Sequence, residues 1–381
     1  MSPLDKKIRV AIMADVIDRR PERTLVARRL AEYLLTREDV ELTLIHYEIV
    51  PDDTLYDRAH EIIIPTETFP FRSRFLSFLK FAITTKEQFD IVHWLVGRVY
   101  PFFWWLPTKK TMVTAFDGGS VFAPGPWIVS RFIYNWVLRL WNSKIAALVG
   151  SSSFGSEQIR SAYWVPQKRM RIVPVGIDTS YQPREQTDIA SALRGRGLSY
   201  KGYVLYVGGM QPHKNVSALI AAYTMYRKDG GSGKLVIVGD PAYGGGVVER
   251  VINESPYKSD IIAFPYSSNE ELPKIYNGAL MYVHPSLNEG FGLPPVEAMA
   301  SGTPVVSSNA ASLPEVTGGA ALLVDAKKPQ ALADAMLKVH NDLKLQEELS
   351  RKGIESAKRY TWEKMGEQYV SLYHSLLRSS S

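Results

Sequence analysis

The sequence predicts an α/β protein of two doubly wound domains, each built on a parallel sheet. Three observations lead to this fold class. Short apolar runs alternate with helical patterns along most of the chain, and this alternation is typical of strand–helix–strand units. The alternation stops at a polar stretch near residues 179–200 and then starts again. Finally, 381 residues are more than one compact core usually holds.

The first half carries five predicted strands and one long helix. The helix is expected in RTLVARRLAEYLLTR, after the first strand. The strands are expected in KIRVAIMAD, VELTLIHYE, FDIVHWL, TMVTAFD and IAALVGSSS. The polar stretch at 179–200 has no clear period and is interpreted as the linker, so the first domain is placed at residues 1–180.

The second half repeats the pattern at residues 181–361. Its predicted strands are YVLYVGG, KLVIVGD, IIAFPY, LMYVHPS and PVVSSN. The end of the chain, from LKLQEELS to YHSLL, is helical and amphipathic. Ligands of such sheets bind at the carboxyl ends of the strands. We therefore expect a ligand in a cleft between two facing sheets.

Composition excludes several classes of chemistry. The chain has no cysteine, so disulfides, thiolate catalysis and cysteine-ligated zinc are excluded, and a reducing compartment is favoured. No run approaches the 18 to 20 or so apolar residues of a spanning helix. Arg9 interrupts an N-terminal apolar run that is too short for a signal peptide. We expect a cytoplasmic protein.

One stretch, residues 68–144, is both basic and aromatic. It holds ten basic and three acidic residues and six of the eight tryptophans. This combination suggests either nucleic acid or a membrane surface. No nucleic-acid motif accompanies it, so we favour an anionic membrane. PWIVSRFIYNWVLRLW within the stretch has the alternative interpretation of a core helix.

The segment HPSLNEGFGLPPVEAMASGTPVV, residues 284–306, predicts a strand, a glycine loop and a helix. Pro294 and Pro295 suit the first turn of a helix, where a missing N–H costs nothing, and Gly302 suits its end. Gly290 and Gly292 let backbone amides approach a ligand, and the helix N-terminus adds partial positive charge. Such a place suits a phosphate.

Two carboxylates, Glu289 and Glu297, lie eight positions apart in this segment. Glu289 is in the loop and Glu297 is one turn into the helix, so both are expected to face one pocket. Carboxylates accept hydrogen bonds from vicinal hydroxyls such as those of a ribose or hexose. Together with the phosphate-friendly loop, they predict a sugar nucleotide site. His284, ahead of this loop, is interpreted as a structural histidine.

At this point the chain resembles a known family. EGFGLPPVE resembles the Glu-x7-Glu signature of the retaining glycosyltransferases of family four, which share the GT-B architecture of two facing Rossmann-like domains. YVGGMQPHKNVSALIAAY, SGTPVVSSNAASLPEVTGGAALLVD and YTWEKMGEQYVSLY are also similar to that family. The resemblance covers nearly the whole chain and is strongest after residue 200.

The resemblance implies roles for individual residues. Glu289 would contact the donor sugar, Glu297 the nucleotide ribose, and Lys214 the diphosphate leaving group. The turn and the amides beside the diphosphate would come from Gly208, Gly209, Phe291, Gly292 and Leu293. Residues 181–361 would form the donor domain and residues 1–180 the acceptor domain. The last helix, about residues 362–381, would cross back to join the acceptor domain.

One departure concerns the donor sugar. The family's His-Asp pair at the end of the fourth strand reads Phe116-Asp117 here, and Asp117 is taken as a third candidate catalytic residue. Phe116 offers no partner to a 6-hydroxyl, so a 6-deoxyhexose or pentose donor is expected. Alternatively, Phe116 points into the sheet and a neighbour such as His93 takes the place of the family's histidine.

The resulting prediction is a retaining glycosyltransferase. It would move a sugar from a nucleotide diphosphate to an acceptor hydroxyl, with a lipid-linked saccharide of the bacterial envelope, such as lipopolysaccharide, as acceptor. No Asp-x-Asp motif is present, and Lys214 with helix amides can meet the leaving charge, so neither a metal nor another cofactor is expected. Two alternatives stay open: a sugar-nucleotide epimerase of similar architecture, and an inactive sugar-nucleotide-binding subunit.

Overall fold

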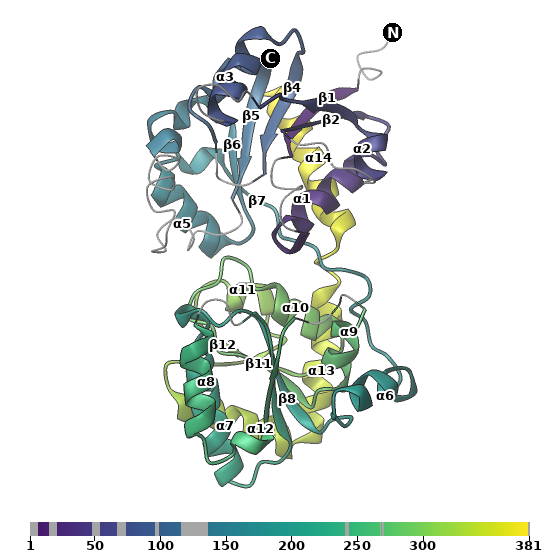
Figure 1. Ribbon diagram of the computed structural model, residues 1–381, viewed down its shortest axis with the longest axis vertical. Coiled ribbons are helices and arrows are strands. Elements are labelled where there is room, and N and C mark those ends of the chain that lie inside the picture. Colours follow the sequence, from purple (N-terminus) through teal and green to yellow (C-terminus); the bar gives the residue numbers. More distant parts are fainter. Residues whose placement is uncertain are drawn as a thin grey trace. The chain divides into compact units, whose positions relative to one another are not determined.

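The chain forms two compact units (Figure 1). The computed structural model describes residues 7–14, 21–47, 54–66, 74–95, 99–115, 136–240, 244–266, 268 and 270–379. Unit 1 comprises Met1–Gly176 with Trp362–Ser381, and unit 2 comprises Ile177–Thr361. Each unit contains a parallel sheet with helices around it, which confirms the predicted α/β fold class.

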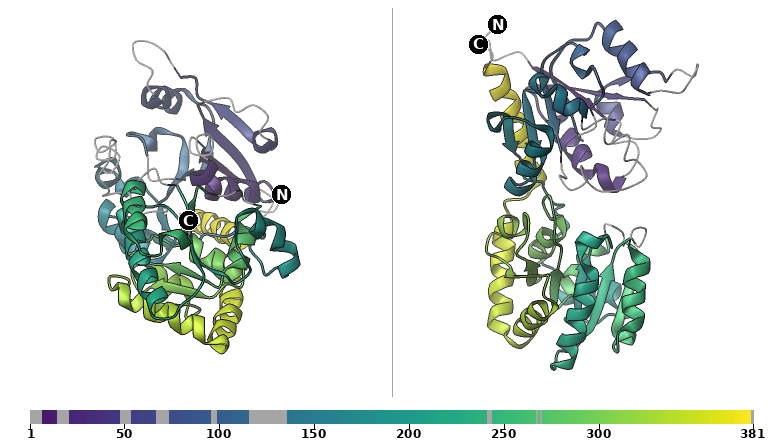
Figure 2. Two further views of the ribbon diagram at one scale, coloured as in Figure 1. Left: turned by 60° about the horizontal axis from the view of Figure 1, so that its bottom comes forward. Right: turned by 90° about the vertical axis from the view of Figure 1, so that its left-hand side faces the viewer.

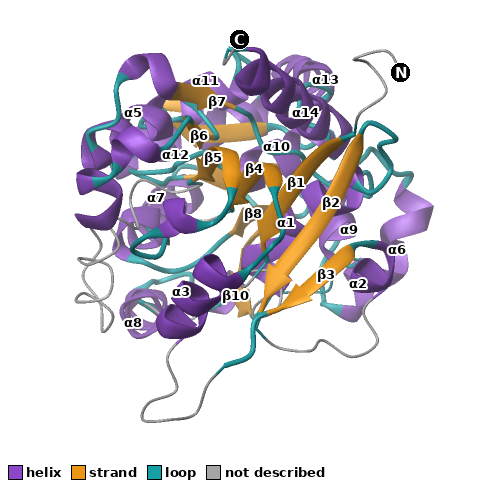
Figure 3. Cartoon of the chain, turned by 90° about the horizontal axis from the view of Figure 1, so that it is seen from above, coloured by secondary structure: helices purple, strands orange, loops and turns teal. Residues whose placement is uncertain are grey.

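The sheet of unit 1 has the strand order β3-β2-β1-β4-β5-β6-β7 within the described residues, and Figure 3 lets the reader follow this order across the unit. All its neighbouring strands pair in parallel. The strands are β1 (Ile8–Met13), β2 (Val40–His46), β3 (His60–Ile63), β4 (Phe89–Trp94), β5 (Thr108–Thr114), β6 (Ala147–Gly150) and β7 (Met170–Ile172). β4 is buried along its whole length, as expected for a central strand covered on both faces.

The helices of unit 1 cover this sheet and enclose its core. They are α1 (Pro21–Leu34), α2 (Thr54–Arg58), α3 (Arg74–Thr84), α5 (Ser153–Tyr163) and α14 (Trp362–Arg378), with short 3₁₀ turns η1 (Phe103–Trp105), η3 (Asn142–Lys144) and η4 (Gln167–Arg169). The core is rich in aromatic rings, and Phe78 of α3 packs edge-on against Trp94 at a ring separation of 5.5 Å.

The sheet of unit 2 has the order β10-β9-β8-β11-β12-β13 in the described part of the chain, again with parallel pairing. The strands are β8 (Tyr203–Val207), β9 (Lys234–Val238), β10 (Ile261–Phe264), β11 (Met281–His284), β12 (Val305–Ser308) and β13 (Leu322–Val324). The order changes direction between β8 and β11. In open α/β sheets, ligands bind beyond the carboxyl ends of the strands at such a switch point.

Helices flank this second sheet. They are α6 (Gln186–Gly195), α7 (Val216–Lys228), α8 (Gly245–Glu254), α9 (Leu272–Gly278), α10 (Leu293–Ala300), α11 (Leu313–Thr317), α12 (Pro329–Asn341) and α13 (Leu343–Ala357), with 3₁₀ turns η5 (Pro212–Lys214) and η6 (Lys258–Asp260). The predicted helical end of the chain is therefore two helices, α13 and α14, separated by a short break.

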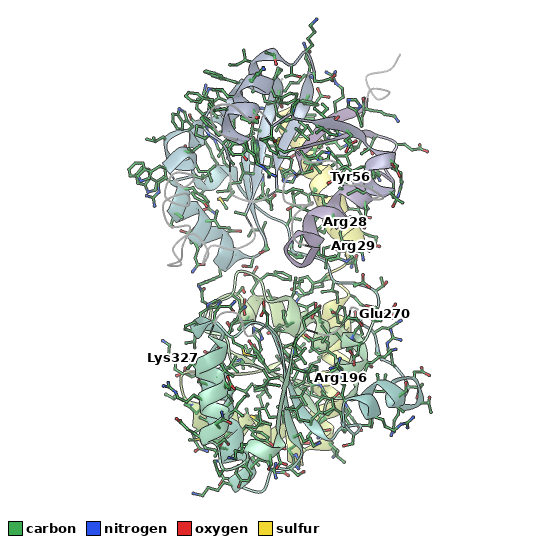
Figure 4. All side chains as sticks on the ribbon, viewed as in Figure 1. Arg28, Arg29, Tyr56, Arg196, Glu270 and Lys327 are labelled. Carbon is green, nitrogen blue, oxygen red and sulfur yellow. The ribbon has the colours of Figure 1, made fainter. Side chains whose placement is uncertain are left out.

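The linker prediction at 179–200 is wrong for its central part, which forms α6. Ile189 and Leu193 lie four residues apart on one face of α6, and both are buried. Arg196, labelled in Figure 4, follows the helix and makes two 2.7 Å hydrogen bonds to Glu271. The segment is thus fastened to unit 2. Two apolar residues in a polar context gave too weak a periodicity to predict it.

In the part of the chain that the structure describes, three strands were not predicted: β3, β7 and β13. Each has only three or four residues, and none is buried throughout. Each also lies at an edge of its sheet. A short, half-exposed edge strand carries little of the apolar signal by which central strands are recognised.

The last helix, α14, belongs to unit 1 and is drawn in yellow in Figures 1 and 2. It approaches α1 so closely at Gly366 that an added Cβ would lie 2.1 Å from the ring of Tyr33. Two tyrosines of α14, Tyr369 and Tyr373, are fully buried against the sheet. A glycine at the crossing and apolar rings beside it explain why the helix docks there.

His93 of β4 joins α14 to the sheet. Its ring is fully buried, with Nδ1 2.8 Å from the Tyr373 hydroxyl and Nε2 2.7 Å from Thr114 Oγ1. Thr114 Oγ1 lies 3.2 Å from the Tyr369 hydroxyl. Both ring nitrogens of His93 are therefore occupied within unit 1. The hypothesis that His93 replaces the family's donor-site histidine gains no support, because its ring bonds to α14.

Within the described residues, no helix is both long enough and apolar enough to cross a membrane.

We expect the hydrogen bonds of His93 to contribute to the free energy of unfolding. Tyr373→Phe leaves a buried ring nitrogen without its partner, which costs roughly 1 to 3 kcal/mol, and scanning calorimetry should record a lower unfolding temperature. Burial lowers the pKa of His93 to about 3, whereas the unfolded chain takes up this proton near pH 6.5. The contribution of the neutral His93 ring to the free energy of unfolding is therefore complete above about pH 6.5 and is lost as the pH falls toward 3.

The matched control is Tyr200→Phe, which removes a hydroxyl from a tyrosine that is 40% exposed. It should leave the transition unchanged. In His93→Gln, which does not titrate, the transition should depend less on pH below 6.5 than in the wild type. Equal transitions for Tyr373→Phe and Tyr200→Phe would contradict the assignment.

Candidate functional site

The candidate site lies at the carboxyl ends of β8 and β11, where the strand order of unit 2 changes direction. Two loops meet there, one after each strand. The amide of Leu287 donates to the carbonyl of His213 at 2.8 Å, and the Ser286 hydroxyl donates to the same carbonyl. Asn215, in the left-handed conformation, donates from Nδ2 to the carbonyls of Pro285 and Ala326. These bonds hold the lysine-bearing loop against the glutamate-bearing loop.

The loop after β8 turns through glycine. Gly208 has a φ of 150°, and an added Cβ would lie 2.9 Å from the Tyr206 hydroxyl. At Gly209 a Cβ would lie 2.3 Å from Gln211 Oε1. The two glycines thus form the tight turn that leads into η5, and η5 ends at Lys214. This is where the family resemblance implied a turn beside a lysine that contacts the diphosphate.

Lys214 and Glu289 form an ion pair at the centre of the site. The ammonium lies 2.7 Å from Oε1 and 2.9 Å from Oε2 of the carboxylate. The side chains are only 21% and 11% exposed, respectively. His284, at the end of β11 and 1% exposed, places Nε2 2.9 Å from the same Oε1. The structure therefore brings together two predicted residues and one that the sequence interpretation had left structural.

These partners determine the charge of Glu289. Burial alone would raise its pKa, but the charge of Lys214 and the hydrogen bond of His284 outweigh burial and hold the pKa well below its usual range. Burial lowers the pKa of His284, more than the neighbouring carboxylate raises it. At neutral pH the site thus contains a carboxylate, an ammonium and a neutral imidazole.

Glu297 lies on α10 in a different environment. Its Oε2 accepts a 2.9 Å hydrogen bond from the Tyr276 hydroxyl. Burial raises the pKa of Glu297 to about 7, against the smaller opposite effect of hydrogen bonds from Tyr276 and Tyr181. No described cation makes an ion pair with it. The two predicted carboxylates therefore differ in charge near neutral pH, although they lie in one segment.

The helix between them follows the predicted pattern. Gly292, with a φ of 101°, precedes α10, and prolines occupy its first turn. Gly302, with a φ of 75°, follows the end of the helix. Leu293 is its first residue, and the Phe291 ring is buried edge-on against Tyr360 at 5.3 Å. The Phe291 side chain is thus part of the core, and only its backbone is available to a ligand.

Ser312 fixes the backbone of the loop that contains Glu289 and Phe291. Its hydroxyl donates to the carbonyls of Glu289 and Phe291, at 3.0 and 2.8 Å. Tying these carbonyls down fixes the direction of the neighbouring amides. Ser312 and Tyr276 were not predicted, because they are distant in sequence from the motif. Asp117 and Phe116 lie outside the described residues.

No group of three or more histidine, aspartate or glutamate residues in the described ranges is arranged to hold a metal ion.

Comparison with known proteins assigns the chain to a family. Residues 197–356 match the family described as Glycosyl transferases group 1. The O-antigen chain mannosyltransferase B of Escherichia coli is 31% identical over 226 residues, which are 59% of this chain and 59% of that protein. The D-inositol 3-phosphate glycosyltransferase of Acidothermus cellulolyticus is 30% identical over 318 residues, which are 76% of this chain and 68% of that protein.

Solved structures share the fold. Sucrose-phosphate synthase of Thermosynechococcus elongatus has a TM-score of 0.74 at 21% identity, covering 98% of this chain and all of that one. An Anabaena protein solved with UDP and glucose has a TM-score of 0.75 at 15% identity, covering 97% of this chain and all of that one. These matches confirm the GT-B fold. With the family match and the 30% identity to the Acidothermus protein, they show that the chain belongs to the glycosyl transferases group 1 family.

Proposed function

We propose that the protein is a retaining glycosyltransferase that moves a sugar from a nucleotide diphosphate sugar to a hydroxyl of a saccharide. The observation that carries this proposal is the partly buried Lys214–Glu289 pair at the switch point of unit 2. The relatives support it, since one is named for mannosyl transfer in O-antigen chains and another for glycosyl transfer involving inositol 3-phosphate. A nucleotide sugar donor agrees with the UDP and glucose bound to the Anabaena protein.

In this proposal Lys214 stabilises the leaving diphosphate. Negative charge grows on the diphosphate as the glycosidic bond breaks, and a preorganised cation is most useful where charge develops. The turn of Gly208 and Gly209 and the amides of Phe291, Gly292 and Leu293 would border the diphosphate. No metal or other cofactor is needed in this scheme.

The carboxylates would bind hydroxyls. Glu289, held ionised, would accept hydrogen bonds from the donor sugar and stabilise the oxocarbenium-like transition state. Glu297 would accept from the ribose. The acceptor would attack on the face that the diphosphate leaves, and a diphosphate oxygen would take its proton, so the anomeric configuration is retained. Asp117 is proposed as a third catalytic residue by family position alone.

A donor and acceptor panel tests the proposal. UDP-, GDP- and dTDP-sugars are incubated with and without a lipid-linked saccharide, in buffer with and without EDTA. We expect acceptor-dependent nucleotide release that EDTA does not reduce, and a product whose anomeric proton shows the donor's configuration by NMR. Isomerisation without acceptor would indicate an epimerase, and binding without turnover an inactive subunit.

Competition between GDP-mannose and its 6-deoxy counterpart, GDP-rhamnose, tests the prediction made from Phe116. We expect a preference of up to about 10²-fold for the deoxy sugar.

Glu289→Ala and Lys214→Ala should each lower turnover by about 10²- to 10³-fold, because both act at the reacting end of the donor. Glu297→Ala should mainly weaken nucleotide affinity, measured by calorimetry. The matched control is Lys234→Ala, a lysine whose ammonium donates to the carbonyl of Gly197, outside the site. Near-normal turnover of Glu289→Ala or Lys214→Ala at saturating donor would refute the assignment.

We also propose that unit 1 binds the inner face of the cytoplasmic membrane, where a lipid-linked acceptor would be found. Four large apolar side chains of α3, η1 and the segment before β6 are 43 to 62% exposed: Leu76, Ile83, Trp105 and Leu140. Exposed lysines accompany them: Lys80, Lys86, Lys109 and Lys144. α3 packs beside η1, and Trp104 lies 4.9 Å from Trp141, so the aromatic groups adjoin. An anionic bilayer complements such a surface.

The variants that test this surface replace side chains that the structure shows to be exposed. Trp104 is partly buried against the core, and Lys109 pairs with Asp90 at 2.7 Å, so neither is the best probe. One variant replaces Ile83 and Trp105 by serine, and another replaces Lys80, Lys86 and Lys144 by glutamine. Each variant should show reduced flotation with phosphatidylglycerol vesicles. Each lysine contributes about 1 kcal/mol, lost at high salt. A control with Val247 and Leu343 of unit 2 replaced by serine should float like the wild type; equal flotation of all variants would exclude this surface.

A further inference from the structure

A buried tyrosine and histidine lie behind the Lys214–Glu289 pair. Tyr282 and His284 are two residues apart on β11, so their side chains point to the same face of the sheet. Both are buried, at 0 and 1% exposed. The Tyr282 hydroxyl lies 2.7 Å from Nδ1 of His284, and Nε2 of the same ring lies 2.9 Å from Oε1 of Glu289. The three groups form one continuous line of hydrogen bonds.

The direction of these bonds follows from charge. An ionised carboxylate only accepts hydrogen bonds, so Nε2 of His284 must carry the proton that is shared with Glu289. In a neutral imidazole the other nitrogen is then an acceptor. Its partner is Tyr282, whose hydroxyl has two acceptors within reach, Nδ1 at 2.7 Å and the carbonyl of Val207 at 3.2 Å. The shorter distance assigns the single hydroxyl proton to Nδ1.

We infer that His284 is a positioning residue for Glu289 and that Tyr282 fixes the tautomer in which it acts. A carboxylate has two oxygens and can rotate about its last bond. Lys214 contacts both oxygens of Glu289, whereas His284 contacts only Oε1. The histidine therefore distinguishes the two oxygens and sets the plane of the carboxylate. Oε2 is left directed away from the histidine, where a sugar hydroxyl can donate to it.

This role becomes important if Lys214 acts on the diphosphate, and in this respect the inference rests on the proposed function. A diphosphate carries more negative charge than a carboxylate and competes with Glu289 for the ammonium. As the ammonium turns toward the diphosphate, His284 is the described side chain that still holds Glu289. The histidine would keep the carboxylate ionised and aimed while the lysine acts on the leaving group.

Within the described residues, few other titratable groups lie around Glu289. Lys214 approaches from η5, His284 and Tyr282 from β11, and Tyr206 from β8, where burial and, to a smaller extent, the charge of Glu289 raise the pKa of the phenol. Burial raises the pKa of the Tyr282 hydroxyl, and the charge of Glu297, on α10, adds to this rise. Of these, His284 and Lys214 are the ones that donate to the carboxylate, so their removal should change how Glu289 titrates.

The hydrogen-bond direction can be measured without any substrate. In protein labelled with ¹⁵N-histidine, long-range ¹H–¹⁵N spectra report which ring nitrogen is protonated, and His284→Gln identifies the signals. Near pH 7 we expect a neutral ring with the proton on Nε2. In Tyr282→Phe the Nδ1 signal should shift while Nε2 stays protonated. A proton on Nδ1, or an imidazolium at pH 7, would overturn the inference whatever the protein's activity.

Kinetics test the positioning role. With the donor transferred fastest in the panel, His284→Phe should lower kcat by about 10- to 100-fold, as expected for a lost hydrogen bond to a charged group. KM for the donor should change far less. His284→Gln, which keeps an N–H donor, should recover most of the loss. In His284→Phe the acid limb of the pH–rate profile should move to higher pH, because the pKa of Glu289 returns toward its usual value.

The matched control is His340→Phe. His340 of α12 also pairs with a tyrosine, Tyr226, at 2.7 Å, but Tyr226 is ten residues beyond Val216, the first residue of α7, and thus about 15 Å along the helix from the end nearest Lys214. His340→Phe should lower stability without moving kcat or the pH profile. If His284→Phe behaves in the same way, or if His284→Gln is no better than His284→Phe, the histidine is only structural and the inference fails.

Discussion

The buried charge of Glu289 is the constraint on which the site depends. A carboxylate at 11% exposure is costly unless charged and hydrogen-bonding groups surround it. Here the partners come from two loops, Lys214 after β8 and His284 at the end of β11. The loops must therefore meet, and the bonds of Asn215 and His213 that join them are a consequence. Removing either partner would leave a buried charge with half of its compensation.

The same segment shows how position alone divides two carboxylates. Glu289 has an ammonium and an imidazole beside it, and these lower its pKa against the effect of burial. Glu297 has the hydroxyl of Tyr276, which is a weaker compensation, and burial raises its pKa to about 7. Raising the pH through 7 therefore increases the share of ionised Glu297, the form that accepts two hydroxyl donors. Glu289 does not change over that range. The affinity for the nucleotide would therefore depend on the ionisation of Glu297, whereas the rate of sugar transfer would depend on Glu289.

Sequence reasoning succeeded where the signal is local. Central strands are apolar runs, and β1, β4, β8 and β11 were found for that reason. The first and last turns of α10 were found because proline and glycine have few other uses there. By contrast, β3 and β13 are short edge strands, and α6 buries only two of its side chains. In these elements the packing of neighbours supplies the stabilisation, and a single sequence does not show it.

The site residues divide in the same way. Glu289 and Lys214 lie 75 positions apart, and it was the motif around each that brought them together in the prediction. His93 bonds to a tyrosine 280 positions away, so its place in the docking of α14 follows only from the folded sheet. His284 is different, because it is five positions from Glu289 and two from Tyr282. The alternation of a strand already puts Tyr282 and His284 on one face, and a histidine that ends a strand ahead of a glutamate-bearing loop can reach that glutamate. Strand parity at the carboxyl end of a central strand is thus a local signal for a positioning histidine, and it depends on no contact that is distant in sequence.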